Sequence, residues 1–198
     1  MRAVIDSFTE KENKRIEEKK YKEYIIDHIN NVKASYDLLF RPFIRDLSTR
    51  SSDIISTYSN KDILDACRLA RENIEFHDRS KYFEEEFYGY RYKYFPTYTE
   101  QTDAGYKELA DKEMDKAWKH HYTHNPHHPE YFGRNKDMPL EYIIEMICDW
   151  QAMSIHFNSS LRGWWKEHTE SKHRVMTDKT FNTVVELLDN LTVLDVVG

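Results

Sequence analysis

Apolar residues recur every three or four positions over long stretches of this chain. One such stripe contains Ile25, Ile29, Val32, Tyr36 and Leu39. This spacing places side chains on one face of an α-helix. The 198 residues include only 5 Gly and 5 Pro, too few for an architecture rich in turns. The sequence therefore predicts an all-α protein.

The same pattern sets the expected bounds of the helices. The first follows a Lys/Glu run over residues 9–23 and should end near Pro42, because proline does not continue a regular helix. Residues 46–60 should form a loop with a short helix around Ile54 and Ile55. Further helices are expected over residues 62–76, residues 107–123, from Pro139 onward, and over residues 178–191.

We expect these helices to form one domain over residues 1–198, since this length suits a single core and no internal repeat is evident. Its core should span about residues 24–168. Residues 82–106 are rich in aromatic side chains and form an insertion with two interpretations. The insertion either packs its rings over the core or forms a lid that stacks on a flat substrate.

Charge and composition argue against several classes of partner, although a local basic site could still bind a small anion. A net charge of −6 gives no reason to expect binding to a nucleic-acid duplex. Cys67 and Cys148 lie among apolar residues, so a disulfide framework is not expected. Neither a signal peptide nor an apolar run of about 18 residues is evident, which predicts a cytoplasmic protein without a membrane partner. The sequence does not indicate an oligomeric state.

Several polar residues fall on the expected inner faces of different helices. They are His28, His77 with its neighbour Asp78, His121 and Asp149. A buried charge is costly unless it is paired or bound to metal, and each residue alone could be satisfied by an ordinary hydrogen bond. Their coincidence favours a metal site. His127 and His128 follow in a proline-containing loop, and His124 could replace His121, whereas His120 aligns with Glu113 and Lys116 and should face solvent.

The order of these residues resembles the HD superfamily of metal-dependent phosphohydrolases. The segment His77–Lys81 is similar to its H-D-x-G-K signature, with Ser80 where glycine is usual. The segment His127–Gly133 is similar to the H-H-E-x-x-x-G segment of HD-GYP phosphodiesterases, with Pro129 inserted. The segments 28–32 and 147–154 resemble the helices of the first and last ligands, the latter one residue shorter than usual. The resemblance covers residues 24–160, and the Gly-Tyr-Pro tripeptide is absent.

The resemblance implies an HD-like helical bundle with one or two divalent ions between its helices. It implies a first ion held by His28, His77, Asp78 and Asp149, and a second ion, bridged by Asp78, held by His121 with His127 or His128 or both. Imidazole and carboxylate ligands suit Mn, Fe, Ni, Co or Zn. Asp78, Lys81 and Glu130 are the implied catalytic residues, and Lys81 and Asn125 would contact the substrate.

We therefore expect a metal-dependent phosphohydrolase that acts on a small phosphorylated substrate such as a nucleotide. Two other functions fit the same ligand pattern. HD-fold di-iron oxygenases share it and also bind anionic substrates, and a non-catalytic binding protein could carry a structural metal. A little-described HD-like family of bacteria and their phages is also similar, and this likeness implies no substrate.

Overall fold

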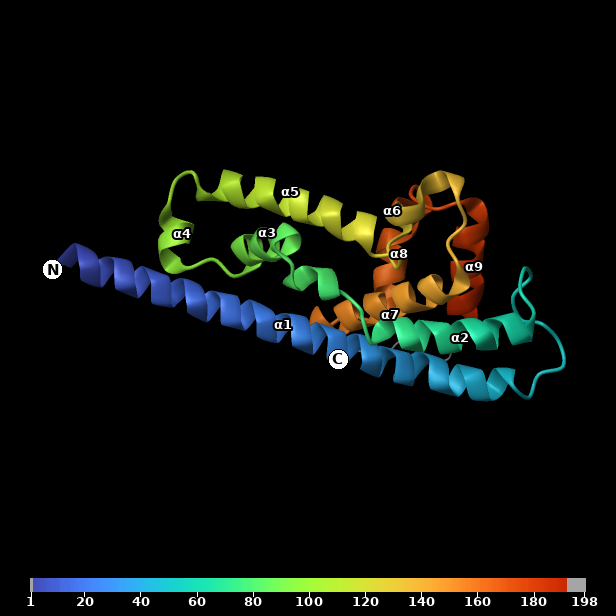
Figure 1. Ribbon diagram of the computed structural model, residues 1–198. Helices are drawn as coiled ribbons and strands as arrows, with labels where there is room; N and C mark the ends of the chain where they lie inside the picture. The colour runs from blue at the N-terminus through green and yellow to red at the C-terminus, as the bar shows by residue number, and fades with distance from the viewer. Residues whose placement is uncertain (1, 192–198) are drawn as a thin grey trace. The chain divides into compact units, whose positions relative to one another are not determined.

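A computed structural model describes the backbone of residues 2–191 and the side chains of residues 9–191. Every regular element in this part of the chain is helical, which confirms the all-α class. The main helices, labelled in Figure 1, are α1 (Arg2–Leu47), α2 (Asn60–Ile74), α3 (Glu84–Tyr94), α4 (Tyr98–Thr102), α5 (Tyr106–His124), α6 (Pro129–Phe132), α7 (Leu140–His156), α8 (Leu161–His173) and α9 (Asp178–Asn190). Two short 3₁₀ helices, η1 (Arg79–Tyr82) and η2 (Gly133–Asn135), follow α2 and α6.

The chain divides into two compact units, which we describe separately. Unit 1 comprises Met1–Asp27 and Asp78–Asn125, and unit 2 comprises His28–His77 and Pro126–Gly198. Helix α1 contributes residues to both units. No helix among the described residues is both long enough and apolar enough to cross a membrane.

Helix α1 does not end near Pro42, as the sequence analysis predicts, but continues to Leu47. Proline lacks the N–H that would bond to the carbonyl of Leu38, four residues earlier, so it weakens the helix at this turn. The buried side chains of Phe40, Phe43 and Leu47 lie on both sides of the proline and hold the last turns against the core. Tertiary packing here outweighs the local cost of proline.

In unit 1, α3 and α5 pack side by side (Figure 1). Gly89 allows their close approach, since a Cβ atom built at this position would lie 2.5 Å from both the Ala117 Cβ and the Glu113 carbonyl oxygen. Phe87 and Tyr90 of α3 are buried and lie near the buried ring of Tyr21, with ring centroids 5.0 and 6.4 Å away. The aromatic segment 82–106 therefore supplies core residues of this unit.

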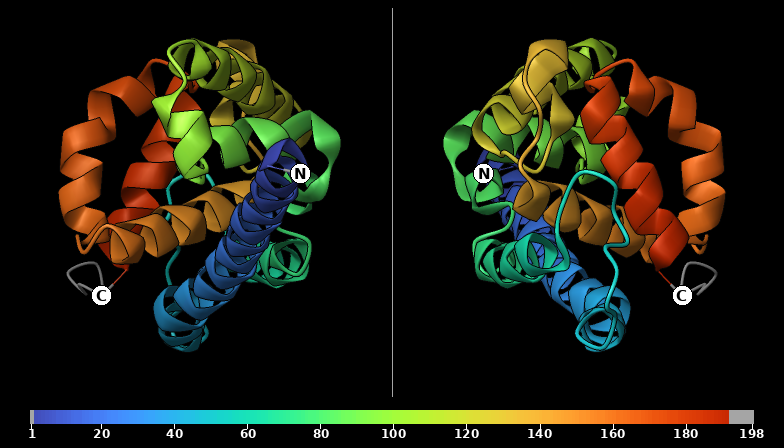
Figure 2. Two further views of the ribbon diagram at one scale, coloured as in Figure 1. Left: turned by 90° about the vertical axis from the view of Figure 1, so that its left-hand side faces the viewer. Right: turned by 90° about the vertical axis from the view of Figure 1, so that its right-hand side faces the viewer.

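Unit 2 contains the main apolar core, to which α1, α2, α7 and α9 contribute. Ser59 caps the start of α2 through a reciprocal bond pattern with Asp62. Helix α7 is buried over most of its length, as its apolar composition predicts, and Pro139 occupies its N-cap. Helix α8, which the sequence analysis does not predict, packs against both α7 and α9 (Figure 2).

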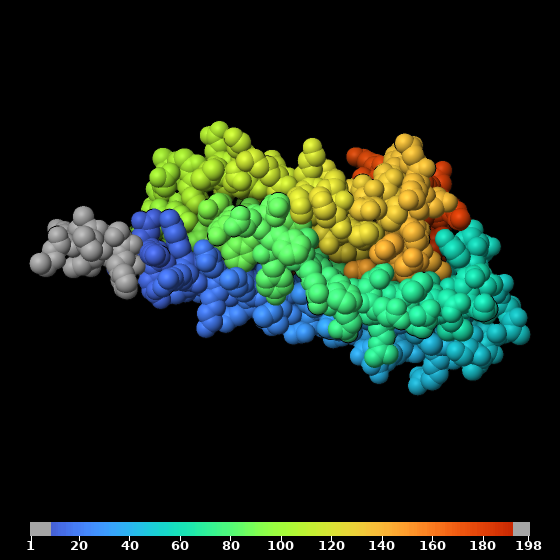
Figure 3. Space-filling view, viewed as in Figure 1, coloured from blue at the N-terminus to red at the C-terminus, as the bar shows by residue number. Residues whose placement is uncertain are grey.

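The segment between α1 and α2 is an exposed loop, visible at the surface in cyan (Figure 3). The expected short helix around Ile54 and Ile55 is wrong, because the backbone instead forms an isolated bridge between Ile55 and Tyr58. Ile55 is buried and anchors the loop to the core of unit 2. The apolar character of Ile55 thus reflects its burial in the core and not a helical turn.

Candidate metal-binding residues

Three elements of unit 2 bring His28, His77 and Asp149 together. His28 lies on the apolar stripe of α1, His77 follows the end of α2, and Asp149 lies on α7. The His77 backbone N–H donates to the Ile74 carbonyl at 3.2 Å, which turns the chain at this helix end. Both histidines are buried. The predicted inward direction of His28 and His77 is therefore confirmed.

The three side chains present nitrogen and oxygen atoms to a common point. His28 Nε2 lies 3.2 Å from Asp149 Oδ1, and His77 Nε2 lies 3.8 Å from the same oxygen. One donor atom from each residue lies within 4.8 Å of the others, close enough for a single ion. The carboxylate of Asp149 thus lies beside two histidines.

Glu145 is a member of this cluster that the sequence analysis missed. It lies four residues before Asp149 on α7, hence on the same helix face, and it is buried. Its Oε1 accepts from His77 Nδ1 at 2.9 Å, and lies 3.3 Å from His127 Nδ1. The sequence feature that could have identified Glu145 is its spacing of four residues from Asp149 in an otherwise apolar helix.

Both carboxylates of α7 are held ionised. Burial raises the pKa of Glu145, but hydrogen bonds from His127 and His77 outweigh burial and bring the pKa down to about 2. Burial likewise raises the pKa of Asp149, but the adjacent imidazoles of His28 and His77 outweigh burial and bring the pKa well below its usual value. Two negative charges in the interior of unit 2 require compensating positive charge, from protonated histidines or from a cation.

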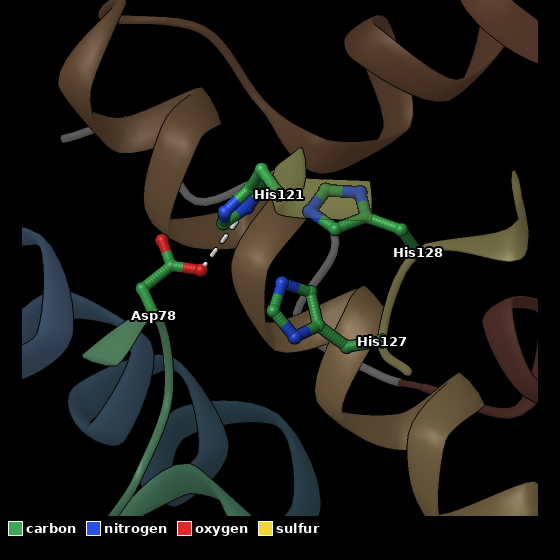
Figure 4. A group of neighbouring side chains, drawn as sticks. All are labelled: Asp78, His121, His127 and His128. Carbon is green, nitrogen blue, oxygen red and sulfur yellow. Dashed lines mark ion pairs between the residues drawn. The ribbon is translucent and has the colours of Figure 1, made fainter. Parts of the chain in front are cut away.

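His127 and His128 lie in the loop before α6. Their ring centroids are 4.4 Å apart, and both are drawn in Figure 4. His127 is buried and joins His77 and Glu145 in a second group of donors whose atoms lie within 4.8 Å of one another. Glu130 follows in the first turn of α6, and its Oε2 is buried with no hydrogen-bond partner among the described residues.

Unit 1 places Asp78, Lys81 and His121 together. Asp78 is buried, lies at the N-cap of η1 and has a left-handed backbone with φ of 55°. Its Oδ2 is 2.6 Å from Lys81 Nζ, and its Oδ1 is 3.3 Å from His121 Nε2 (Figure 4). The ammonium of Lys81 also lies over the Tyr90 ring, 5.2 Å from its centroid. Lys81 is therefore fixed as a partly buried cation.

Glu86, which the sequence analysis also missed, orients His121. Its Oε2 accepts from His121 Nδ1 at 2.8 Å, and its side chain is fully buried. Burial lowers the pKa of His121, while Asp78 and Glu86 oppose that effect without reversing it. Burial raises the pKa of Glu86, but hydrogen bonds from His121 and His120 outweigh burial and lower it. Glu86 follows Glu84 and Glu85 at the start of α3. A run of three glutamates is typical of a solvated first turn, so the sequence did not single out Glu86.

The remaining predicted residues of unit 1 surround His121. The Asn125 amide donates to Ser80 Oγ and to the His121 carbonyl, each at 2.8 Å, so Asn125 fixes the end of α5. His121 is buried as predicted, whereas His124 is exposed and does not take its place. His120 is partly exposed, and it also donates to Glu86.

Residues 17–190 match the model of a family of unknown function (DUF5662). The chain belongs to this family. The matched segment contains all the candidate residues, from His28 in α1 to Asp149 in α7, and both orienting glutamates. No curated protein and no solved structure was found to match the chain.

Proposed function

We propose that this protein is a metal-dependent phosphohydrolase acting on a nucleotide or related phosphate ester. The metal part of the proposal rests on the contacts that His77 makes through its two ring nitrogens. Its Nδ1 donates to Glu145, which leaves Nε2 as the lone-pair atom that faces Asp149 and His28. A histidine oriented by a carboxylate through its second nitrogen is the usual arrangement of a metal ligand.

The donor set of His28, His77 and Asp149 fits a borderline divalent ion. Two imidazole nitrogens and one carboxylate suit Mn, Fe, Co, Ni or Zn. Three protein ligands leave positions open for water and substrate, as in catalytic metal sites. The two ionised carboxylates of α7 would supply the negative charge that such an ion neutralises. The assignment of Asp78, His121, His127 and His128 to one or two ions stays a prediction.

The phosphate part of the proposal is supported by Lys81 and by the resemblance to HD phosphohydrolases. A bound divalent ion would supply an activated water near neutral pH and polarise the phosphoryl oxygens. The Asp78 carboxylate holds the Lys81 ammonium in place at 2.6 Å, so that little reorganisation is needed when a phosphate oxygen arrives. The same contact gives the charge of Lys81 a fixed direction.

Metal analysis and a substrate panel test this proposal. Protein purified without chelators should contain a transition metal, and Asp149→Asn should lose most of it while keeping its helical circular dichroism. Glu141→Gln, one helical turn before Glu145 on the same helix, is the matched control and should keep its metal. Wild-type protein that takes up no Mn, Fe, Co, Ni or Zn on reconstitution would exclude the proposal.

Lys81→Ala tests the phosphate role separately from metal binding. A protonated ammonium does not ligate a cation, so the metal content should stay unchanged. The kcat/KM for the best phosphate ester should fall by roughly 10²-fold, as for the loss of one preorganised electrostatic contact. Lys81→Arg should recover only part of the activity. Wild-type turnover by Lys81→Ala would rule out this role.

Iron-dependent oxygenation is a second candidate, favoured by one observation. Two histidines and one carboxylate with open positions are also the donor set of non-haem iron oxygenases. Iron in the purified protein together with oxygen consumption on an anionic substrate would favour this function. Zinc, manganese, cobalt or nickel together with release of inorganic phosphate would favour the hydrolase.

A further inference from the structure

Two histidines on the surface of α5 form a pair outside the groups described above. His120 and His124 are four residues apart, so they lie on the same face of the helix. Their rings are nearly parallel, with centroids 3.8 Å apart and planes inclined by 13°. His124 is exposed and the His120 side chain is 24% exposed, so solvent ions can reach the pair.

Hydrogen bonds fix which nitrogen carries the hydrogen in each ring. His120 Nδ1 lies 2.8 Å from Glu86 Oε1, and His124 Nδ1 lies 2.8 Å from the His120 carbonyl oxygen. A carboxylate and a carbonyl only accept, so each Nδ1 must donate. In a neutral imidazole the other nitrogen then keeps its lone pair. Both rings therefore offer Nε2 as a ligand atom.

We propose that His120 and His124 bind a divalent transition-metal ion of the zinc, nickel or copper class through their Nε2 atoms. Two histidines four residues apart on one face of a helix are a known pair of zinc ligands. The ring centroids of His120 and His124 are 3.8 Å apart, and small rotations of the two rings would turn both Nε2 atoms toward one ion. Water completes the coordination. Magnesium and calcium are excluded as occupants because they require oxygen ligands.

Glu86 gives this surface site a direct connection to His121. Its Oε1 accepts from His120 and its Oε2 accepts from His121. A cation on Nε2 of His120 makes the Nδ1–H group a stronger donor, which draws electron density from the shared carboxylate. The surface site thus acts on the same glutamate that orients His121.

Metal titration of single-residue variants tests the site. Chelator-treated protein is titrated with Zn²⁺ and with Ni²⁺ by isothermal calorimetry. His120→Ala and His124→Ala should each lose one bound ion, or bind it at least about tenfold more weakly. His173→Ala is the matched control, because His173 is exposed on α8 with no histidine three or four residues away, and it should bind as wild type does. Unchanged binding in both α5 variants would overturn the proposal.

A further variant separates this site from the buried donors. Asp149→Asn removes the carboxylate between His28 and His77, and it should retain the ion bound at the surface pair. If Asp149→Asn abolishes all binding of Zn²⁺ and Ni²⁺, the surface site is refuted. If it keeps one ion that the added His124→Ala change removes, the surface site stands, whether or not the hydrolase proposal does.

The tautomers of His120 and His124 can be tested on the wild-type protein, so this test does not depend on whether a variant folds. Long-range ¹H–¹⁵N spectra of the metal-free protein should show the Nδ1–H form in both rings, and the Nε2 resonances should shift when Zn²⁺ is added. An Nε2–H tautomer in either ring, or Nε2 resonances that do not respond to Zn²⁺, would contradict the assignment.

Discussion

His77 and His121 have matching surroundings, each in its own unit. In both residues, Nδ1 lies within 2.9 Å of a buried glutamate and Nε2 faces an aspartate. Helical periodicity alone predicts that the histidines point inward, because their apolar neighbours fix the phase of each helix. The glutamates were missed, because periodicity does not distinguish a buried glutamate from a solvated one.

Glu145→Gln should weaken metal binding without removing a ligand. The neutral amide is a weaker acceptor for the Nδ1–H of His77 than the carboxylate, and the loss of such an orienting partner typically reduces metal affinity by about 10–100-fold. Competition with a chromophoric chelator measures the affinity. Glu141→Gln serves as the control on the same helix. Equal affinities for the two variants would show that Glu145 does not orient the ligand.

Two buried tyrosines should respond in opposite ways to loss of the hydroxyl. Tyr36 donates to the Cys67 carbonyl at 2.8 Å, whereas the Tyr21 hydroxyl is buried with no hydrogen-bond partner among the described residues. Tyr36→Phe should lower the free energy of unfolding by about 1 kcal/mol. Tyr21→Phe should leave it unchanged or raise it. Urea denaturation measures both, and the reverse order would contradict this account.

Among the elements, the end of α1 and the presence of α8 were not predicted from the spacing of apolar residues. The proline rule predicts an end near Pro42, but burial of Phe43 and Leu47 extends the helix. Helix α8 combines a polar face with Trp164 and Trp165, which pack on Trp150. Its mostly polar sequence carries few apolar residues, so periodicity gave little signal. By contrast, α5, α7 and α9 begin within one residue of their predicted starts.

Gly89→Ala should destabilise the pair of helices α3 and α5. Alanine gains roughly 1 kcal/mol in helix propensity over glycine, but its Cβ would lie 2.5 Å from Ala117 and the Glu113 backbone. Overpacking of this kind costs typically 1–3 kcal/mol, so we expect a net loss of about 1 kcal/mol. Gly105→Ala, whose Cβ would find no atom closer than 3.5 Å, is the tolerated control. Thermal denaturation compares them, and equal melting temperatures would refute the close approach.

The α4 segment should contribute stability that depends on pH through Glu100. Burial raises the pKa of Glu100, but hydrogen bonds from buried Arg91 and the Thr97 backbone outweigh burial and lower it. A lowered folded-state pKa means that this stabilisation is complete above the ordinary value of about 4.3 and disappears as the pH falls through the folded-state pKa. Glu100→Gln should therefore cost about 3 kcal/mol at pH 7 and progressively less toward pH 3. A cost that is constant between pH 7 and pH 3 would contradict this.

For the whole molecule, the sequence correctly predicted the helical class and the inward direction of His28, His77, Asp78 and His121. The division into two units was not expected, because periodicity reports on each helix alone and contains no information on how helices group. The single domain over residues 1–198 and the HD-like arrangement stay predictions. The buried carboxylates of Glu145 and Asp149 would couple the folding of the chain to a bound metal ion, because their charge requires compensation in the interior.

Metal should stabilise the folded protein as a whole. An ion that binds only the native state at 100 times its Kd adds about 2.7 kcal/mol to the free energy of unfolding, which for a chain of this size corresponds to a rise of about 5–10 °C in Tm. Differential scanning calorimetry with and without Zn²⁺ measures the shift. Asp149→Asn should lose most of it. A shift of the same size in both proteins would place the stabilising ion elsewhere.

The left-handed backbone of Asp78 has a consequence for the evolution of the family. At a φ of 55°, glycine, asparagine and aspartate are accommodated most easily, whereas alanine is strained. The backbone geometry at position 78 accepts three residue types, whereas the predicted role as a metal ligand would require the carboxylate. In a relative that no longer binds metal, asparagine or glycine should replace Asp78 more often than any other amino acid does. Position 78 would then record, in each relative, whether the ion is still in use.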